Sequence, residues 1–354
     1  MAETIDPRPR RMVSTLASPS FTTWAGAMPV LGAMVYPWLL AASFHSARWF
    51  GHAGPAGAPA LALSLAAVFA VPALGLREAI RLSGPACSAG HVRLRGIACC
   101  VVAVPALYTF VGVETDLAHI ARFENLLWLL LWCGILWFQQ RAGSDHDVVC
   151  ATPALPAALR IMHGIGAALL LLGYVAIHLS NHLAGLWGAE THLALMDVLR
   201  RWYRHPLVEP VLVLLVLAQL GTGTLLLRHW LSGDTDVPRT LQVGTGAYLG
   251  VYIICHLNST FVYARAALGI DTNFWFASGG TAGLLGDAWA VRLLPHYAVA
   301  VLALVLHVSA GLRVLLLAHG ARPARVAWLL PAGWIAGSAV AIGAVLPLLR
   351  VHPF

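Results

Sequence analysis

Two segments of this chain repeat one another and carry a histidine at the same position. They read GIGAALLLLGYVAIHLSN (residues 164–181) and QVGTGAYLGVYIICHLNS (residues 242–259), so that His178 in the first corresponds to His256 in the second. Both segments are apolar enough to cross a bilayer, where an ionisable side chain is costly and is usually functional. Two imidazoles on equivalent helices can face one another, and an iron ion held in a haem is the simplest group to place between them.

A second match links the helices that follow these two segments. The sequence QLGTG begins at Gln219, and its counterpart HVSAG begins at His307. The repeat therefore predicts one matched His/His pair and one Gln/His pair. Because glutamine is a poor iron ligand compared with imidazole, a second haem would need another ligand, such as His163, or a five-coordinate iron.

The composition indicates which elements must position these residues. Of 354 residues, 59% are hydrophobic and 10% are charged, against about 25% charged in soluble proteins. Apolar runs of about 20 residues, enough to span the hydrocarbon core, recur along the chain. We expect an all-α, polytopic transmembrane bundle of about nine helices. The predicted spans are 24–44, 59–80, 96–113, 124–140, 161–184, 207–227, 241–264, 292–317 and 328–348.

The rise of an α-helix predicts the depth of each polar residue. His178 and His256 should lie at similar depth near the outer leaflet, whereas His307 and Gln219 should lie toward the inner side, with His163 at the inner end of its helix. The alternative for a single histidine in such a helix is a hydrogen-bonded packing residue. We keep that alternative for four of them: His163, His182, His229 and His296.

Several charged residues near the ends of the spans are further candidates. Arg313 could hold a haem propionate, or extend toward the lipid headgroups. Glu209, with His182 and Arg204, could form a quinone site at the outer rim, and Glu209 could instead be a favourable charge at a helix N-terminus. Glycines in the repeat would let helices or a flat macrocycle approach closely, or serve ordinary helix packing. These are Gly166, Gly173, Gly223, Gly244 and Gly311.

A polar break at residues 139–156 divides the chain. We place a boundary near residue 155, between an N-terminal four-helix membrane region (1–155) of unknown role and a five-helix region (156–354). The chain contains no lysine, so its basic residues are all arginine. If the N-terminus is cytoplasmic, most of these arginines lie on the cytoplasmic side, as the positive-inside rule prefers. The net charge of +7 is therefore attributed to membrane topology, and no nucleic-acid partner is expected. The six cysteines contain no CxxC pair and predict no iron–sulfur site.

At residues 157–354 the sequence resembles the dihaem cytochrome b membrane anchor of succinate dehydrogenases and fumarate reductases, of the single-subunit five-helix type. The matching stretches are LRIMHGIG, AIHLSNHLAG, HPLVEPVLVL, LQVGTGAYLGVYIICHLNSTF and LHVSAGLRV. The resemblance implies that His178 and His256 ligate the haem nearer the outside and that His307 ligates the inner haem. Gln219 departs from the family, whose second helix supplies a histidine. The N-terminal four helices have no counterpart in it.

The sequence therefore favours a b-type cytochrome that passes electrons between a quinone and a redox partner. The resemblance implies a bacterial cytoplasmic membrane, with flavoprotein and iron–sulfur subunits docked on the inside around Arg160, Arg228 and Arg239. Two other classes stay open. One is a transporter whose histidines relay protons, since internal repeats suit transporters. The other is a membrane scaffold that has lost electron transfer, which Gln219 would suit.

Overall fold

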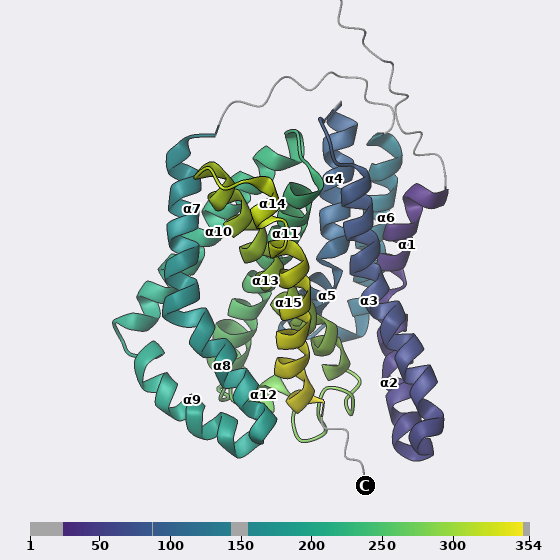
Figure 1. Cartoon of the computed structure of the whole chain (residues 1–354). Helices are drawn as coiled ribbons and strands as arrows, with labels where there is room; N and C mark the ends of the chain where they lie inside the picture. Colours follow the sequence, from purple (N-terminus) through teal and green to yellow (C-terminus); the bar gives the residue numbers. More distant parts are fainter. Residues whose placement is uncertain (1–23, 87, 143–154, 350–354) are drawn as a thin grey trace, which may run out of the picture.

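The structure, a computed structural model, describes residues 24–86, 88–142 and 155–349. These residues form an all-helical protein (Figure 1), with a single isolated β-bridge between Gly84 and Thr235. The predicted boundary near residue 155 borders a segment outside the described residues. The first 23 residues, on which the predicted N-terminal orientation partly depends, also lie outside them.

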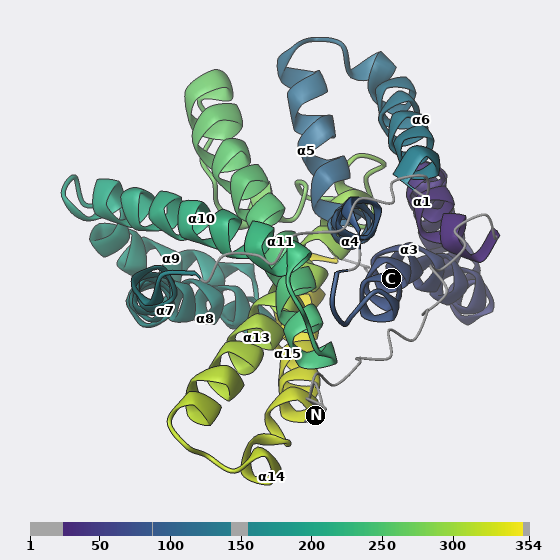
Figure 2. The same cartoon turned by 90° about the horizontal axis from the view of Figure 1, so that it is seen from above.

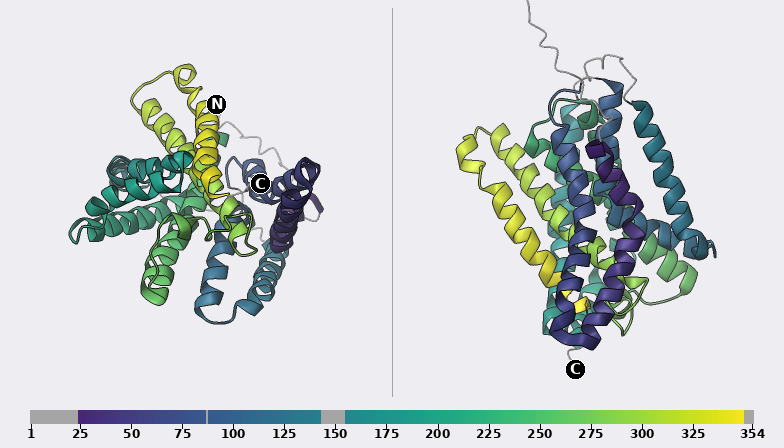
Figure 3. Two further views of the ribbon diagram at one scale, coloured as in Figure 1. Left: turned by 90° about the horizontal axis from the view of Figure 1, so that it is seen from below. Right: turned by 90° about the vertical axis from the view of Figure 1, so that its right-hand side faces the viewer.

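Within the described residues, six helical segments are long and apolar enough to span a membrane, or seven if one bent pair is counted. The longest, Tyr36–Arg81, contains α2 (Tyr36–Ala53), a 3-10 turn (Gly54–Gly57) and α3 (Ala58–Arg81). Its 46 residues would extend about 69 Å as one straight helix, more than twice the thickness of the hydrocarbon core. Instead, α2 and α3 pack side by side as a hairpin (Figure 3).

The predicted span 96–113 is not one straight helix. It divides into α4 (Ala89–Val102) and α5 (Val104–Leu117), which meet at an angle of 69°. Pro105 lies in the first turn of α5, where its ring and its missing N–H end the preceding helix. The predicted span 24–44 is likewise divided, at Val35, between α1 (Trp24–Met34) and α2. The fourth predicted span corresponds to α6 (Glu124–Ala142).

The second half begins with one long helical segment built from α7 (Ala157–Leu170), a π-helix (Leu171–Val175) and α8 (Ala176–Ala184). The helices that follow are α9 (Ala189–Tyr203), α10 (Val208–Ser232), α11 (Val237–Leu257), a second π-helix (Asn258–Leu268), α12 (Phe274–Ala277), α13 (Leu293–Ala318), α14 (Pro323–Val326) and α15 (Leu329–Val345). Helix α11, which carries Gln242, Thr245 and His256, is not among the six candidate spans.

The helix surfaces support a membrane environment. No residue of α10 is buried, and three of its leucines are more than half exposed: Leu214 (65%), Leu217 (51%) and Leu225 (52%). A helix that is apolar yet uncovered is stable where its surroundings are hydrocarbon. These exposed apolar helices indicate an integral membrane protein.

The two halves of the chain share one core. Viewed from above (Figure 2), α1 to α6 lie on one side and α7 to α10 on the other, with α11, α13 and α15 between them. Glu124 of α6 forms a buried ion pair with Arg292, next to the start of α13. Arg95 of α4 donates hydrogen bonds to the carbonyl oxygens of Leu231 and Gly233. The N-terminal helices therefore brace the central helices.

Candidate cofactor site

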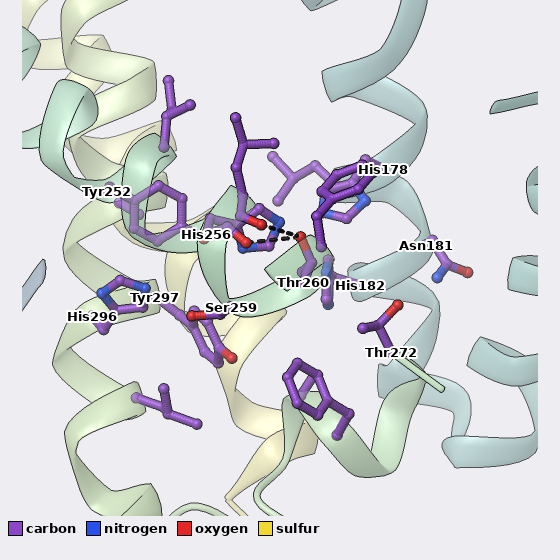
Figure 4. Close-up of a pocket in the computed structure, with 18 of the residues that line it drawn as sticks. His178, Asn181, His182, Tyr252, His256, Ser259, Thr260, Thr272, His296 and Tyr297 are labelled. Carbon is purple, nitrogen blue, oxygen red and sulfur yellow. Dashed lines mark hydrogen bonds between the residues drawn. The ribbon is translucent and has the colours of Figure 1, made fainter. Parts of the chain in front are cut away.

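The matched histidines of the repeat face one another. His178 on α8 and His256 on α11 have ring centres 6.1 Å apart, with ring planes inclined at 69° (Figure 4). Each ring stacks on a tyrosine four residues earlier, Tyr174 at 5.2 Å and Tyr252 at 5.6 Å. Side chains four apart are neighbours on a helix face, so each repeat carries a Tyr–His stack that sets the plane of its imidazole. The two tyrosines correspond in the repeat, which makes this a repeated feature.

The separation of the two rings fits a shared metal ion. An ion bonded to one nitrogen of each ring at about 2 Å, with that nitrogen about 1.1 Å from the ring centre, requires ring centres about 6.2 Å apart. The observed 6.1 Å agrees with this value. If a haem were bound here, His178 and His256 would be the residues that hold its iron, one from each side. Within the described residues, no three His, Cys, Asp or Glu side chains are placed to hold a metal ion together.

A cavity of about 580 Å³ adjoins this pair and is lined by both histidines and both stacked tyrosines. Its volume lies within the range of about 300–1,000 Å³ typical of ligand and cofactor sites. It reaches from Arg204 and Glu209 at one end to Gln219. The cavity is thus large enough for a cofactor and continues toward the other end of the bundle.

Both helices that carry these histidines depart from α-helical geometry next to the histidine. The π-helix Leu171–Val175 ends three residues before His178, and the π-helix Asn258–Leu268 begins two residues after His256. Single π turns inside helices are rare and occur frequently at functional sites. The sequence analysis did not predict these turns, because the apolar pattern runs through both segments without interruption.

The three predicted quinone residues all line this cavity, although they do not contact one another in a single group. Glu209 pairs with Arg265 at 2.6 Å, which the sequence analysis did not predict. Arg204 donates a hydrogen bond to the hydroxyl of Thr272 at 2.7 Å. His182 lies deeper, with its ring centre 4.9 Å from that of His178.

Sequence analysis missed three buried polar residues in the cavity wall. His192 (3% exposed), Asn181 (6%) and His296 (2%) each have a buried polar atom without a hydrogen-bond partner in the structure. Asn181 and His192 contact each other at 3.2 Å through their other polar atoms. His296 had been assigned to packing, and its ring lies 4.6 Å from Tyr252. Unpaired buried polar atoms are uncommon, and they are consistent with water or a polar ligand in the cavity.

Charged residues outside the membrane spans gather at the end of the bundle where Arg204 lines the cavity. Asp271 accepts hydrogen bonds from Arg200 at 3.0 Å, and Arg204 lies 3.7 Å from it. Burial raises the pKa of Asp271, but the two arginines outweigh burial and its pKa is lowered. Burial, and then the charge of Arg200, lowers the pKa of His192 to about 4, so this histidine is neutral at pH 7.

A second pair of imidazoles lies at the other end of the bundle. His163 on α7 and His307 on α13 have ring centres 6.4 Å apart, with planes inclined at 78°. Gln219, the residue that the repeat matches to His307, instead forms a hydrogen bond with His163 at 3.2 Å. The ring that faces His307 is that of His163, which the sequence analysis had named as the alternative to Gln219. Arg313 is half-buried on α13 and lies near Arg239.

The glycines of the repeat serve the two roles expected of them, which are close approach of neighbouring groups and ordinary helix packing. A Cβ at Gly166 would lie 2.7 Å from Gln219 Oε1, and one at Gly223 would lie 3.3 Å from His163 Cε1. Gly244, in contrast, faces Leu76 of the N-terminal half at 3.3 Å, so it serves helix packing. Gly311 faces Gln242, and Gly173 faces open space.

Comparisons with protein-family models, with curated proteins and with solved structures found no match to this chain.

Proposed function

We propose that this protein is a membrane-embedded b-type cytochrome that passes electrons between a quinone pool and a redox partner. The observation that carries the proposal is the facing pair His178 and His256, at a ring separation suited to one metal ion. A haem bound there supplies an iron that alternates between two oxidation states. The chain's own residues would hold the iron through His178 and His256, with their ring planes fixed by Tyr174 and Tyr252.

Quinone exchange is proposed at the end of the cavity lined by Glu209, Arg204 and His182. The Glu209–Arg265 pair and the Arg204–Thr272 hydrogen bond provide charged and polar groups at the membrane surface. A quinone headgroup needs such groups, while its tail needs the apolar helix surfaces beside them. The cavity places both kinds of surface next to the proposed haem pair.

The remaining parts of the proposal follow from the resemblance. It places the chain in a bacterial cytoplasmic membrane with its N-terminus inside, as the arginine distribution also favours. Flavoprotein and iron–sulfur subunits would dock on that side around Arg160, Arg228 and Arg239. We also propose that the chain crosses the membrane nine times. In this arrangement α2 and α3 cross the membrane separately, and α11 is one of the spans.

A proton-coupled transporter is the second candidate, and one observation favours it. The bent pair α4 and α5 is a broken helix within the membrane region, contrary to the continuous helices expected from sequence. Broken helices are typical of transporter binding sites. The bend itself packs against α3, where a Cβ at Gly75 would lie 2.6 Å from the backbone nitrogen of Val102, which supports a bracing role.

A reduced-minus-oxidised optical spectrum of the purified protein tests the proposal, with haem counted by the pyridine haemochrome method. We expect a low-spin b-type signal. His178→Ala and His256→Ala should each remove the same haem, because a five-coordinate iron is held less tightly and loses its low-spin spectrum. His205→Ala, at an exposed histidine on the same side, is the matched control and should keep it. A wild-type protein without haem, or full haem in either ligand variant, would contradict the assignment.

A further inference from the structure

A second cavity, of about 780 Å³, lies between the two halves of the chain and shares no lining residue with the cavity at the histidine pair. Its walls come from α4, α5 and α6 in the N-terminal half and from α10 and α11 in the C-terminal half. In Figure 2, α6 and α10 lie on either side of α4 and α11. We call this cavity the interhalf groove, and its lining includes Arg93, Leu131, Phe138, Leu227 and Val251.

The interhalf groove is apolar and is reached from the surface of the bundle. Of the described residues that line it, Arg93 is the one that carries a charge, and the others are apolar side chains, glycines and cysteines. On α6, Leu130 is 59% exposed, Leu131 is 43% exposed and Phe138 is 45% exposed. Water finds no hydrogen-bond partners on such a surface, and an unfilled groove loses the dispersion contacts of its walls. Hydrocarbon is therefore the occupant that this surface favours.

The length of the groove matches one leaflet of a bilayer. Along α4 the groove extends from Arg93 to Ala103, ten residues or about 15 Å. The hydrocarbon core is about 30 Å thick, so each leaflet contributes about 15 Å. Beyond Ala103 the chain turns by 69° into α5, whose residue Leu107 still lines the groove. A transmembrane helix needs the full thickness of the core and does not fit here, whereas an acyl chain of one leaflet does.

The end of the groove opposite the bend suits an anionic headgroup. Arg93 lies there, near the start of α4, with its guanidinium carbon 5.2 Å from the ring centre of Phe138. This cation–π contact holds the charge beside the mouth of the groove. In the topology proposed above, this end faces the cytoplasm, and basic pockets between helices on that side bind anionic lipid headgroups.

Two glycines keep the groove free of side chains. Gly96 on α4 and Gly134 on α6 both line it, and a Cβ at either position would have nothing within 4 Å. Glycine destabilises a helix interior relative to alanine, and no close approach requires glycine at these two positions. Free space in the groove gives both glycines a role.

We propose that the interhalf groove binds one anionic phospholipid, whose acyl chain lies along α4 and α6 and whose phosphate lies beside Arg93. The lipid contacts helices of both halves and fills the space between α6 and the central helices. This inference does not depend on the cofactor, because none of the residues that carry it lines the histidine cavity.

Native mass spectrometry of the full-length protein tests the headgroup. The protein is purified in detergent and mixed with dioleoyl phosphatidylglycerol or dioleoyl phosphatidylcholine. We expect one bound phosphatidylglycerol per chain, and about fivefold weaker binding of phosphatidylcholine, which is the effect of one arginine on an anionic headgroup. Arg93→Gln should remove that preference. Arg325→Gln, at an exposed arginine on α14 at the same end of the bundle (Figure 1), is the control and should keep it.

Filling the groove tests the acyl chain. Gly96→Leu and Gly134→Leu enter the groove from different helices, and each should abolish binding of both lipids. Gly221→Leu, on α10 outside the groove and also in open space, is the matched control and should bind as the wild type does.

A labelling measurement on the wild type does not depend on the folding of any variant. Cys100 is exposed in the groove, whereas Cys133 is exposed on α6 outside it. Phosphatidylglycerol should slow the reaction of N-ethylmaleimide with Cys100 several-fold and leave Cys133 unchanged.

Three results would overturn the proposal. One is equal protection of Cys100 and Cys133, or protection of neither. The second is lipid binding that survives both Gly96→Leu and Gly134→Leu. The third is a dimer that Gly96→Leu dissociates, with no lipid bound to the wild type, which would assign the groove to a second copy of the chain.

Discussion

The His178/His256 pair and the His163/His307 pair have nearly the same ring separation and very different surroundings. The first pair is flanked by stacked tyrosines and opens onto a large cavity with charged residues at its rim. The second donates hydrogen bonds to the Thr222 hydroxyl and the Gln242 carbonyl oxygen and has Gly223 and Gly246 beside its rings. The difference lies in access. The first pair lines a cavity that a molecule could enter, whereas the second is in contact with its hydrogen-bond partners and glycines.

The two pairs also differ in symmetry. His178 and His256 come from equivalent positions of the repeat, whereas His163 and His307 do not. The π-helix in the first repeat provides the alignment that makes the second pair possible. Duplication thus explains one site, and a local change in helix geometry explains the other.

The largest expected effect that distinguishes the two pairs comes from the ion pair between Glu124 and Arg292. Glu124→Gln leaves a buried guanidinium without its charged partner and should cost about 3–5 kcal/mol of stability. Arg292 lies fifteen residues before His307, about 22 Å along α13, so the effect should be felt at the level of His178 and His256 rather than at His307. The measurement is the thermal unfolding midpoint, together with loss of the haem signal. Glu78→Gln, in a pair with Arg81 whose side chain is 46% exposed, is the control and should cost less than about 1 kcal/mol. A loss in Glu124→Gln no larger than that in Glu78→Gln would show that the buried pair does not support this part of the bundle.

An added methyl group at Gly246 should affect only the His163/His307 pair. Gly246→Ala places a Cβ 2.9 Å from His307 Cε1, and overpacking of this kind costs about 1–3 kcal/mol. We expect a lower thermal unfolding midpoint, with the haem proposed at His178 and His256 unchanged. Gly250→Ala, on the same helix with nothing within 4 Å of the new Cβ, is the matched control and should be neutral or slightly stabilising. If both variants behave alike, the space beside His307 is not needed for the position of its ring.

The smallest expected effect is a dependence on pH near the His178/His256 pair. Because burial and Arg200 lower the pKa of His192 to about 4, the unfolded chain binds this proton more readily than the folded protein. Stability from this group is full above about pH 6.5 and falls as the pH drops toward 4. Between pH 7 and pH 5 we expect the haem proposed at His178 and His256 to be lost at a lower temperature as the pH falls. His192→Gln should reduce that pH dependence, and His205→Gln should not. An unchanged pH dependence in His192→Gln would assign the acid sensitivity to other groups.

Much of the site could be predicted from the sequence, because the relevant signals are local. The repeat and the spacing of apolar residues predicted that His178 and His256 lie at the same level on neighbouring helices, and the structure places their ring centres 6.1 Å apart with the ring planes inclined at 69°. The partner of His307 could not be predicted in this way. The choice between Gln219 and His163 depends on a rotation about α7, which one π turn changes without altering the apolar pattern.

The sequence alone determined that this is a helical membrane protein with duplicated histidines, because hydrophobicity and helix periodicity are properties of neighbouring residues. Only the tertiary structure decided that α4 and α5 bend at 69°, that Glu209 pairs with Arg265, and that Glu124 meets Arg292. Each of these depends on residues far apart in the chain. Such contacts form where helices happen to cross, and the crossing geometry is set by the packing of whole helices rather than by any short segment.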